Sequence, residues 1–220
     1  MLSPLISVVI PAFNNGPVLA EALCALQKQT VPLGEYEVLI VDDGSTDNTL
    51  ALVSRLGLPS SFCLYQRPNR GAAASRNFGA QASAADLLLF LDSDTIADPD
   101  LVEEHLGNHR EHDRVIVVGR TRALPAAESD HFLSVMGESI FAFAPDVRAQ
   151  PLSFQEVLTR NLSVKRSAFT EIGGFDEEYP GSGYEDVEFA YRAIKLGYDL
   201  LYNPNAAGTH QHTGTLAEVA

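Results

Sequence analysis

The chain has 220 residues, of which 45% are hydrophobic, and this is enough for one substantial core. Its 29 acidic and 15 basic residues give a formal net charge of -14, which argues against a nucleic-acid backbone or an anionic membrane surface as the main partner. Any phosphate group that it binds therefore needs local help, from a metal ion or from helix N-termini.

The N-terminal part contains one apolar stretch, residues 5–13 (LISVVIPAF), which Pro11 and the following Asn14 interrupt well before membrane-spanning length. No basic segment precedes it, so we predict a strand here and neither a signal peptide nor a transmembrane segment. Cys24 and Cys63 have no metal-ligand spacing, and we expect both to be small buried side chains. Unpaired cysteines favour a reducing, cytoplasmic compartment.

From residue 5 to about residue 122, short apolar stretches alternate with amphipathic ones. This pattern predicts strands at 5–13, 36–43, 61–66, 86–92 and 114–120, and helices at 17–29, 46–57, 71–83 and 99–112. Nearly all-apolar strands separated by helices are typical of a parallel sheet that is covered on both faces. In the first helix, the apolar stripe that we expect to face the core consists of Leu19, Ala22, Leu23 and Leu26.

The region after residue 122 is less regular. In the mixed stretch 123–160, Met136, Phe141 and Phe143 are candidates for an acceptor pocket, although such side chains more often serve only packing. Order returns with a short strand near residue 162, a helix at 167–172, a glycine-rich loop, a helix at 185–196 and a strand near 198–202. The inward face predicted for the helix at 185–196 consists of Val187, Ala190, Tyr191 and Ile194.

Polar residues follow three of the predicted strands directly, at PAFN (11–14), DDGS (42–45) and DSD (92–94). Ligands of open parallel sheets bind outside the carboxyl ends of the strands, so we expect these residues to share one site. Helix capping accounts for Ser45 and Asp47. It leaves the aspartates at the ends of two strands unexplained, namely Asp42, Asp43, Asp92 and Asp94.

The run LLLFLDSDT (87–95) places two carboxylates at the end of a strand that should be buried. On an extended chain, Asp92 and Asp94 point to the same side with Cα atoms about 7 Å apart. A divalent cation such as Mg²⁺ or Mn²⁺ would hold the pair against its own repulsion and bind substrate phosphates. The alternative is a solvated turn before Asp98, since D-x-D alone is a weak motif.

Further candidates lie on helix termini and near the end of the chain. Arg70 and Arg76 flank the start of the helix at 71–83, where anions bind readily, although ordinary surface arginines remain an alternative. Glu185 and Asp186 begin a helix, either as partners of the helix dipole or with one of them as a general base. In HQH (210–212) the two histidines are surface residues or metal ligands.

Taken in order, the strand-end aspartates, NRG…RN, D-x-D, GGFDE, ED and a late histidine resemble family 2 glycosyltransferases of the GT-A fold, from about residue 6 to residue 212. The resemblance implies an α/β fold with a Rossmann-like, mostly parallel central sheet flanked by helices and a smaller acceptor-side region. It implies a single domain, 1–220, with a nucleotide-sugar-binding half (1–98) and an acceptor-binding, catalytic half (99–220).

The resemblance also assigns roles to individual residues. Pro11, Phe13 and Asp43 would contact the base of the nucleotide, with Asp42 close by. Arg70 and Arg76 would line the nucleotide pocket, and Asp92 would reach the ribose or the donor sugar. Asp94 would bind the metal ion, with His210 as a late metal ligand and His212 as its rival. Asp186 would be the general base, with Glu185 binding or orienting the acceptor.

The activity that this resemblance implies is inverting, metal-dependent transfer of a sugar. The donor would be a UDP-sugar, the acceptor a saccharide or lipid-linked hydroxyl, and the metal Mn²⁺ or Mg²⁺. From the net charge we expect no nucleic-acid partner, and we expect a cytoplasmic protein that can associate peripherally with the inner face of the membrane. Relatives often carry further C-terminal segments, so we expect an acceptor-binding or membrane-associating part outside these residues.

Other classes of protein also place acidic residues at the ends of parallel strands. A receiver-like domain needs a lysine after a later strand, and Lys165 and Lys195 lie in the wrong places. A nucleotidyltransferase or a Rossmann dehydrogenase needs a glycine-rich phosphate loop after the first strand, which PAFNNG lacks. A catalytically silent domain that binds a nucleotide sugar and a metal stays open as the alternative, and only an activity assay separates it from an enzyme.

Overall fold

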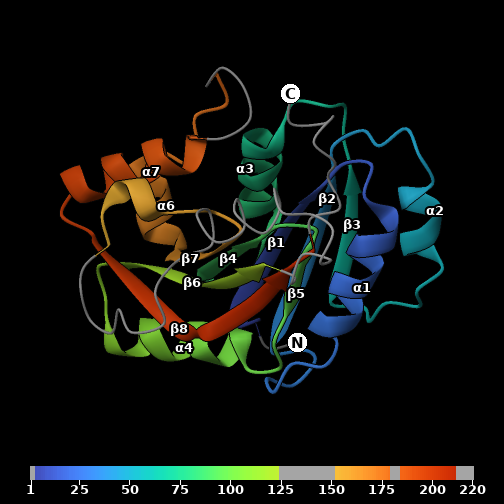
Figure 1. Cartoon of the computed structure of the whole chain (residues 1–220), viewed down its shortest axis with the longest axis horizontal. Helices are drawn as coiled ribbons and strands as arrows, with labels where there is room; N and C mark the ends of the chain where they lie inside the picture. Colours follow the sequence, from blue (N-terminus) through green and yellow to red (C-terminus); the bar gives the residue numbers. More distant parts are fainter. Residues whose placement is uncertain (1–2, 124–151, 179–183, 212–220) are drawn as a thin grey trace, which may run out of the picture.

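The computed structural model describes residues 3–123, 152–178 and 184–211. These residues form one eight-stranded sheet with the strand order β3-β2-β1-β4-β7-β6-β8-β5 (Figure 1). The strands are β1 (Ile6–Ala12), β2 (Tyr36–Asp42), β3 (Phe62–Gln66), β4 (Leu87–Leu91), β5 (Thr95–Ala97), β6 (Val115–Ala123), β7 (Asn161–Lys165) and β8 (Asp199–His210).

The sheet is mixed, with a parallel part that the sequence predicts and antiparallel additions that it does not. Strands β3, β2, β1 and β4 are parallel neighbours, and β6 is parallel to β8. Between these two groups β7 runs antiparallel to both β4 and β6. The short strand β5 was not predicted, and β8 extends to His210, well beyond the strand expected near 198–202, because β6 and β5 both pair with it.

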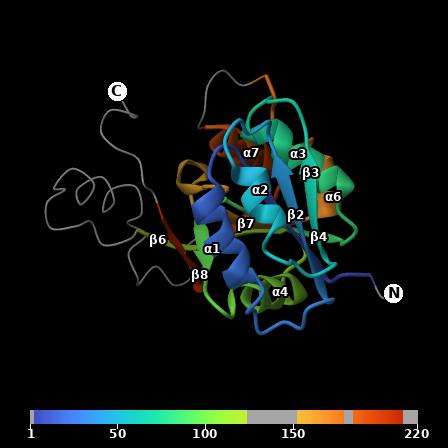
Figure 2. The ribbon, with the colours of Figure 1, turned by 90° about the vertical axis from the view of Figure 1, so that its right-hand side faces the viewer.

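Helices cover both faces of the sheet, as the alternating pattern predicts. Their bounds are α1 (Gly16–Leu26), α2 (Thr49–Ser54), α3 (Ala72–Ala82), α4 (Leu101–Glu111), α6 (Arg166–Ile172) and α7 (Glu185–Lys195), with a 3₁₀ turn, η1, at Phe154–Glu156. Figure 1 shows α3, α6 and α7 on one side of the sheet and α4 on the other. Figure 2 looks onto α1 and α2, which lie side by side.

Successive side chains along a strand point to opposite faces of the sheet, and so they pack into two separate hydrophobic cores. In β1, Val8 belongs to the core with α1 and α4, whereas its neighbour Val9 belongs to the core with α3, α6 and α7. In β4, Leu89 and Phe90 divide in the same way, and all five residues of β4 are buried. A central strand buried on both faces explains why the sequence is apolar at every position there. Such a strand is a rigid support for the residues that follow it.

The structure confirms the predicted buried stripe of α1, since all four of its residues are buried. It corrects two other predictions, the inward face of α7 and the burial of the two cysteines. The buried side chains of α7 are Asp186, Phe189, Ala190 and Ala193, while Val187 is only half-buried and Tyr191 and Ile194 are exposed. The reason is the aromatic cluster beneath α7, where the rings of Phe189 and Phe175 lie 4.8 Å apart. The prediction that both cysteines are buried is also wrong. Cys24 lies on the exposed side of α1, and Cys63 is half-buried.

Several predictions fall on residues outside the described ranges. These are the acceptor-pocket candidates Met136, Phe141 and Phe143, the glycine-rich loop before α7, and His212. Within the described ranges, none of the helices combines the length and the apolar character that a membrane span requires.

Candidate active site

One edge of the sheet gathers nearly all the chemically interesting residues. Strands β1, β2 and β4 end there, and β7 begins there because its Asn161 pairs with Leu91, the last residue of β4. The residues that follow β8 also reach this edge, since Gln211 N–H donates to the Asp94 carbonyl at 2.8 Å. This is the carboxyl edge at which the sequence predicts a ligand site.

The two aspartates of the D-x-D motif lie on a turn and not on an extended chain. Thr95 N–H donates to the Asp92 carbonyl at 3.0 Å, which closes a four-residue turn between β4 and β5. The expectation that both carboxylates project from one side of a strand is therefore wrong. The turn arises because β5 leaves β4 and crosses to pair with β8 at the far end of the sheet order.

The pairing of β5 with β8 brings a histidine to this turn. His210 is the register partner of Thr95, the residue after Asp94. His210 Nε2 lies 3.0 Å from Asp94 Oδ1, and Asp92, Asp94 and His210 each offer one ligand atom, all within 4.8 Å of one another. Two carboxylate oxygens and one imidazole nitrogen suit Mn²⁺ well and leave positions for substrate oxygens. The donor set therefore fits the metal ion that the motif predicts.

Arg76 bridges the D-x-D turn and the start of α7. Its guanidinium donates to Asp92 Oδ1 and to Glu185 Oε1, both at 2.8 Å, and the residue is only 5% exposed. Burial by itself lowers the pKa of Arg76, but the two carboxylates outweigh that effect and raise it. The arginine that the family resemblance assigns to the nucleotide pocket thus ties the D-x-D turn to the helix that carries the candidate base.

Asp186 occupies a buried position beside Glu185 in the first turn of α7. Its Oδ1 accepts the Val187 N–H at 2.8 Å and its Oδ2 accepts the Thr159 N–H at 3.4 Å. Burial, and secondly the charge of Glu185, raise the pKa of Asp186, while the two backbone N–H groups oppose the rise. A carboxylate with a raised pKa is a stronger base, which suits the abstraction of a proton from a hydroxyl group.

Asp42, which ends β2, and Asp43, which follows it, differ in what their carboxylates bind. The carboxylate of Asp43 accepts the N–H groups of Arg70 and Gly71 and the Ser75 hydroxyl, at 2.7 to 3.1 Å, so it holds the loop that begins α3. Among the residues that the structure describes, Asp42 Oδ2 accepts only the Ser45 N–H, at 3.2 Å, and the buried Asp42 Oδ1 has no hydrogen-bond partner. Asp42 therefore keeps acceptor capacity at the end of the strand.

The remaining predicted residues lie around this edge. Phe13 follows β1 and is 48% exposed, and Pro11 is half-buried near the end of β1. The exposed Arg70 side chain lies 3.2 Å from Glu177, so its guanidinium faces the segment after α6 and not the D-x-D turn. An exposed aromatic ring beside the strand-end aspartates is available for stacking on a planar base.

Sequence reasoning missed one cation of the site, Arg160. It comes just before β7, and it interacts electrostatically with Asp92, Asp94 and Asp186. Burial lowers the pKa of Arg160, and the three carboxylates counteract that effect. No motif marks this arginine, and the only signal in the sequence is that it directly precedes a predicted buried strand.

A buried polar network supports the start of β7 from the opposite face of the sheet. His105 on α4 contacts Asn161 Oδ1 and Ser163 Oγ, both at 2.8 Å, and His109 contacts Ser163 Oγ at 2.9 Å. Asn161 Nδ2 in turn donates to the Ala206 carbonyl on β8 at 2.8 Å. The network therefore locks β7 to its neighbours next to Arg160.

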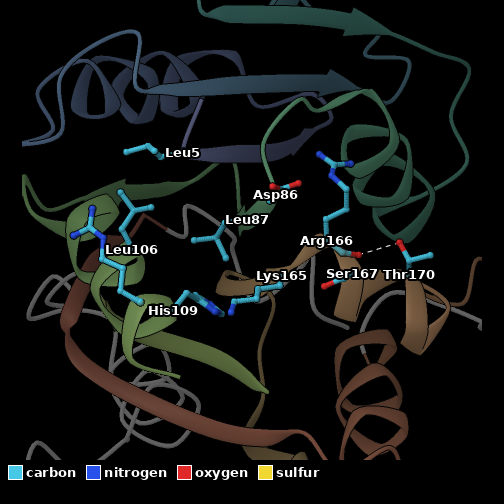
Figure 3. Close-up of a pocket in the computed structure, with 10 residues that line it drawn as sticks. Leu5, Asp86, Leu87, Leu106, His109, Lys165, Arg166, Ser167 and Thr170 are labelled. Carbon is cyan, nitrogen blue, oxygen red and sulfur yellow. Dashed lines mark hydrogen bonds between the residues drawn. The ribbon is translucent and has the colours of Figure 1, made fainter. Parts of the chain in front are cut away.

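A cavity of about 780 Å³ lies at the opposite edge of the sheet, where β1 and β4 begin and β7 ends (Figure 3). Leu5, Leu87 and Leu106 line it together with basic residues that include Arg166. The guanidinium of Arg166 already donates to the carbonyls of residues 80, 83 and 85. Because it lies at the edge opposite to Asp92, Asp94 and Asp186, this cavity is separate from the candidate active site.

Comparison with known families gives two matches. The family model described as "Glycosyl transferase family 2" matches residues 7–172, which is most of the chain. A second model, "N-terminal domain of galactosyltransferase", matches residues 142–214.

Relatives and solved structures agree with these matches, and the likeness to the solved structures confirms the predicted GT-A fold. A validoxylamine A glucosyltransferase of Streptomyces hygroscopicus subsp. jinggangensis is 30% identical, over 93% of this chain and 55% of the relative. S. aureus TarS 1-349 in complex with UDP-GlcNAc has a TM-score of 0.72 at 20% identity, over 98% of this chain and 60% of that one. The mannosyltransferase PcManGT from Pyrobaculum calidifontis, in complex with GDP-Man and Mn²⁺, has a TM-score of 0.70 at 21% identity, over 95% and 57%. The chain thus spans little more than half the length of these proteins.

Proposed function

The chain belongs to glycosyl transferase family 2, and we propose that it is an inverting glycosyltransferase. It transfers a sugar from a nucleoside diphosphate sugar, a UDP-sugar in our proposal, to a hydroxyl group of a saccharide or lipid-linked acceptor. The observation that carries this proposal is the meeting of two groups at one edge of the sheet. These are the Asp92, Asp94 and His210 cluster and the buried carboxylate of Asp186, joined by Arg76 through Asp92 and Glu185.

The metal-binding residues in this proposal are Asp94 and His210, with Asp92 beside them. Their ligand atoms are oxygens and an imidazole nitrogen, which suits Mn²⁺ and also Mg²⁺. When bound, such an ion neutralises charge on the diphosphate of the donor and so makes it a better leaving group. The PcManGT structure is a complex with GDP-Man and Mn²⁺, which supports the same assignment here.

Asp186 is the general base in this mechanism. Its carboxylate accepts the proton of the acceptor hydroxyl while the hydroxyl oxygen forms a bond to the anomeric carbon of the donor sugar. The bond from that carbon to the diphosphate oxygen breaks on the opposite face, and the nucleoside diphosphate leaves with the electron pair. The burial of Asp186 and the neighbouring charge of Glu185 make Asp186 a stronger base. Arg76 holds Glu185 where it can orient the acceptor.

The nucleoside would bind between the ends of β1 and β2. Phe13 is exposed for stacking on the base, and Pro11 lies near the end of the same strand. Asp42 retains a carboxylate oxygen without a partner among the described residues, whereas Asp43 holds the loop that carries Arg70. Accordingly, we propose that Asp42 contributes directly to recognition of the base and that Asp43 contributes by shaping the pocket wall. The TarS complex with UDP-GlcNAc supports the choice of a uridine nucleotide.

Thermal unfolding with UDP and Mn²⁺ tests this function. We expect the two ligands together to raise the Tm of the wild-type protein by several degrees, because a ligand at about 100 times its Kd contributes about 2.7 kcal/mol of stability. The variant Asp94→Ala should lose this rise. Asp113→Ala, which removes a fully exposed carboxylate before β6, should keep it. Equal stabilisation of wild type and Asp94→Ala would refute the metal assignment, and a rise with GDP but not UDP would refute the choice of nucleotide.

A further inference from the structure

The backbone around Arg160 is held between the two acidic parts of the site. The Arg160 carbonyl accepts the Asp92 N–H at 3.3 Å and the Thr95 hydroxyl at 3.4 Å. One residue earlier, the Thr159 N–H donates to Asp186 at 3.4 Å. Residue 160 is therefore fixed to the metal-binding turn on one side and adjoins the contact to the candidate base on the other.

The charges of this region explain why a cation is needed there. Around the D-x-D turn and the start of α7, four carboxylates and two guanidinium groups lie together, so two negative charges remain unbalanced among these six groups, which is the charge of one divalent cation. The carboxylates are those of Asp92, Asp94, Glu185 and Asp186, and the guanidinium groups are those of Arg76 and Arg160. Arg76 is committed to Asp92 and Glu185 by two short hydrogen bonds. Arg160, by contrast, interacts with carboxylates of both the turn and the base.

We propose that the guanidinium group of Arg160 has two alternative sets of partners. Without nucleotide it competes with the metal ion for Asp92 and Asp94, and with nucleotide bound it contacts the diphosphate. This inference rests on the proposed function, since it concerns the same donor. A guanidinium group and a divalent cation repel each other, so each weakens the binding of the other to one pair of carboxylates. A diphosphate reverses this relation, because its several oxygens can bind the metal ion and a planar guanidinium at the same time.

The inference predicts two effects of opposite sign when the charge of Arg160 is removed. Arg160→Met keeps much of the apolar stem of the side chain and lacks the charge. In this variant, Mn²⁺ alone should bind on the order of tenfold more tightly, because a competing cation is gone. UDP, titrated at saturating Mn²⁺, should bind on the order of tenfold more weakly, because a phosphate contact is gone.

Two binding measurements on the purified chain test the inference, and neither depends on turnover. Free Mn²⁺ is followed by electron paramagnetic resonance during titration without nucleotide, and UDP binding is followed by calorimetry with saturating Mn²⁺. Arg160→Lys keeps the charge and should return the Mn²⁺ affinity to within about threefold of wild type, while UDP binding stays weaker than in wild type because an ammonium group lacks the planar fork of a guanidinium. Arg110→Ala is the matched control, because it removes one positive charge from an exposed pair with Glu103 on α4 and should change neither affinity.

The outcomes separate this inference from the proposed function. If wild type binds Mn²⁺ and UDP, and Arg160→Met weakens both or changes neither, Arg160 is only a structural residue and the inference is overturned. If wild type itself shows no metal-dependent binding of UDP, the proposed function fails first. If Arg160→Met does not fold, Arg160→Lys decides. This variant keeps the charge but changes its geometry, so the Mn²⁺ affinity should stay within about threefold of wild type while the affinity for UDP is lower. A tighter or lost Mn²⁺ affinity in the Lys variant overturns the inference.

Discussion

Replacing Arg76 by methionine removes a buried cation and leaves two carboxylates that face each other across its former position. In the wild-type protein the guanidinium donates to Asp92 and Glu185, each at 2.8 Å, and so joins the end of β4 to the start of α7. The methionine side chain fills much of the same space. The change therefore tests the charge of Arg76 more than its volume.

The expected loss follows from the burial of the three groups. Removing one member of a buried ion pair costs about 3–5 kcal/mol, because the remaining charge is left without compensation. The side chain of Asp92 is 29% exposed and that of Glu185 is 12% exposed, so solvent relieves part of this cost. We therefore expect the free energy of unfolding to fall by roughly 2–4 kcal/mol, which corresponds to a Tm lower by about 5–15 °C for a chain of this size.

Urea unfolding at pH 7.5 measures this loss, and a double-mutant cycle with Glu185→Gln isolates the contact. We expect a coupling free energy of about 1–3 kcal/mol between the two positions. Arg110→Ala, which breaks an exposed pair with Glu103, should cost less than about 1 kcal/mol. If Arg76→Met costs no more than this control, and the cycle shows no coupling, then Arg76 does not hold the two parts of the site together and the argument fails.

Three other predictions concern the base, a close contact and the buried histidines. Asp186→Asn should keep UDP and Mn²⁺ binding but lower the rate of transfer by a factor of about 100 or more, and an unchanged rate in a sugar-transfer assay would assign the base elsewhere. Gly119→Ala should cost about 3 kcal/mol or more in urea unfolding, because an added Cβ would lie 2.2 Å from the Asn161 side chain, and a stability within 1 kcal/mol of wild type would contradict this packing. Burial lowers the pKa of His105 to about 4 and that of His109 to about 3, below the ordinary value of 6.5. As the pH falls from 7.5 to 5.5, these histidines become protonated in the unfolded chain but not in the folded one, so the free energy of unfolding should drop by about 1.4 kcal/mol for each histidine. In His105→Gln the drop over this pH range should be smaller by about 1.4 kcal/mol.

Much of the fold was predictable because its signals are local. The apolar runs of β1, β2 and β4 mark buried strands, and the polar residues directly after them mark the carboxyl edge of the sheet. The buried stripe of α1 was predicted correctly from its spacing. Each of these inferences depends only on residues close together in the chain, where a fixed periodicity decides which side chains point the same way.

The inward face of α7 shows where such local reasoning ends. Periodicity predicted a face that includes Tyr191, but the structure buries Phe189. Both faces of this helix carry apolar side chains, so the choice between them was made by the aromatic rings of Phe169 on α6 and of Phe175 on the segment after α6. A single helix does not contain that information.

The sequence by itself determined the alternating architecture, the strand-end aspartates and the acidic pair that begins α7. Only the tertiary structure decided that His210 meets Asp94, that Arg76 joins Asp92 to Glu185, and that Arg160 lies among the carboxylates. These contacts depend on pairings between distant segments, above all the antiparallel registers of β5 with β8 and of β4 with β7. Such registers are set by the packing of the whole sheet, and a shift of one residue in β8 would turn His210 to the opposite face.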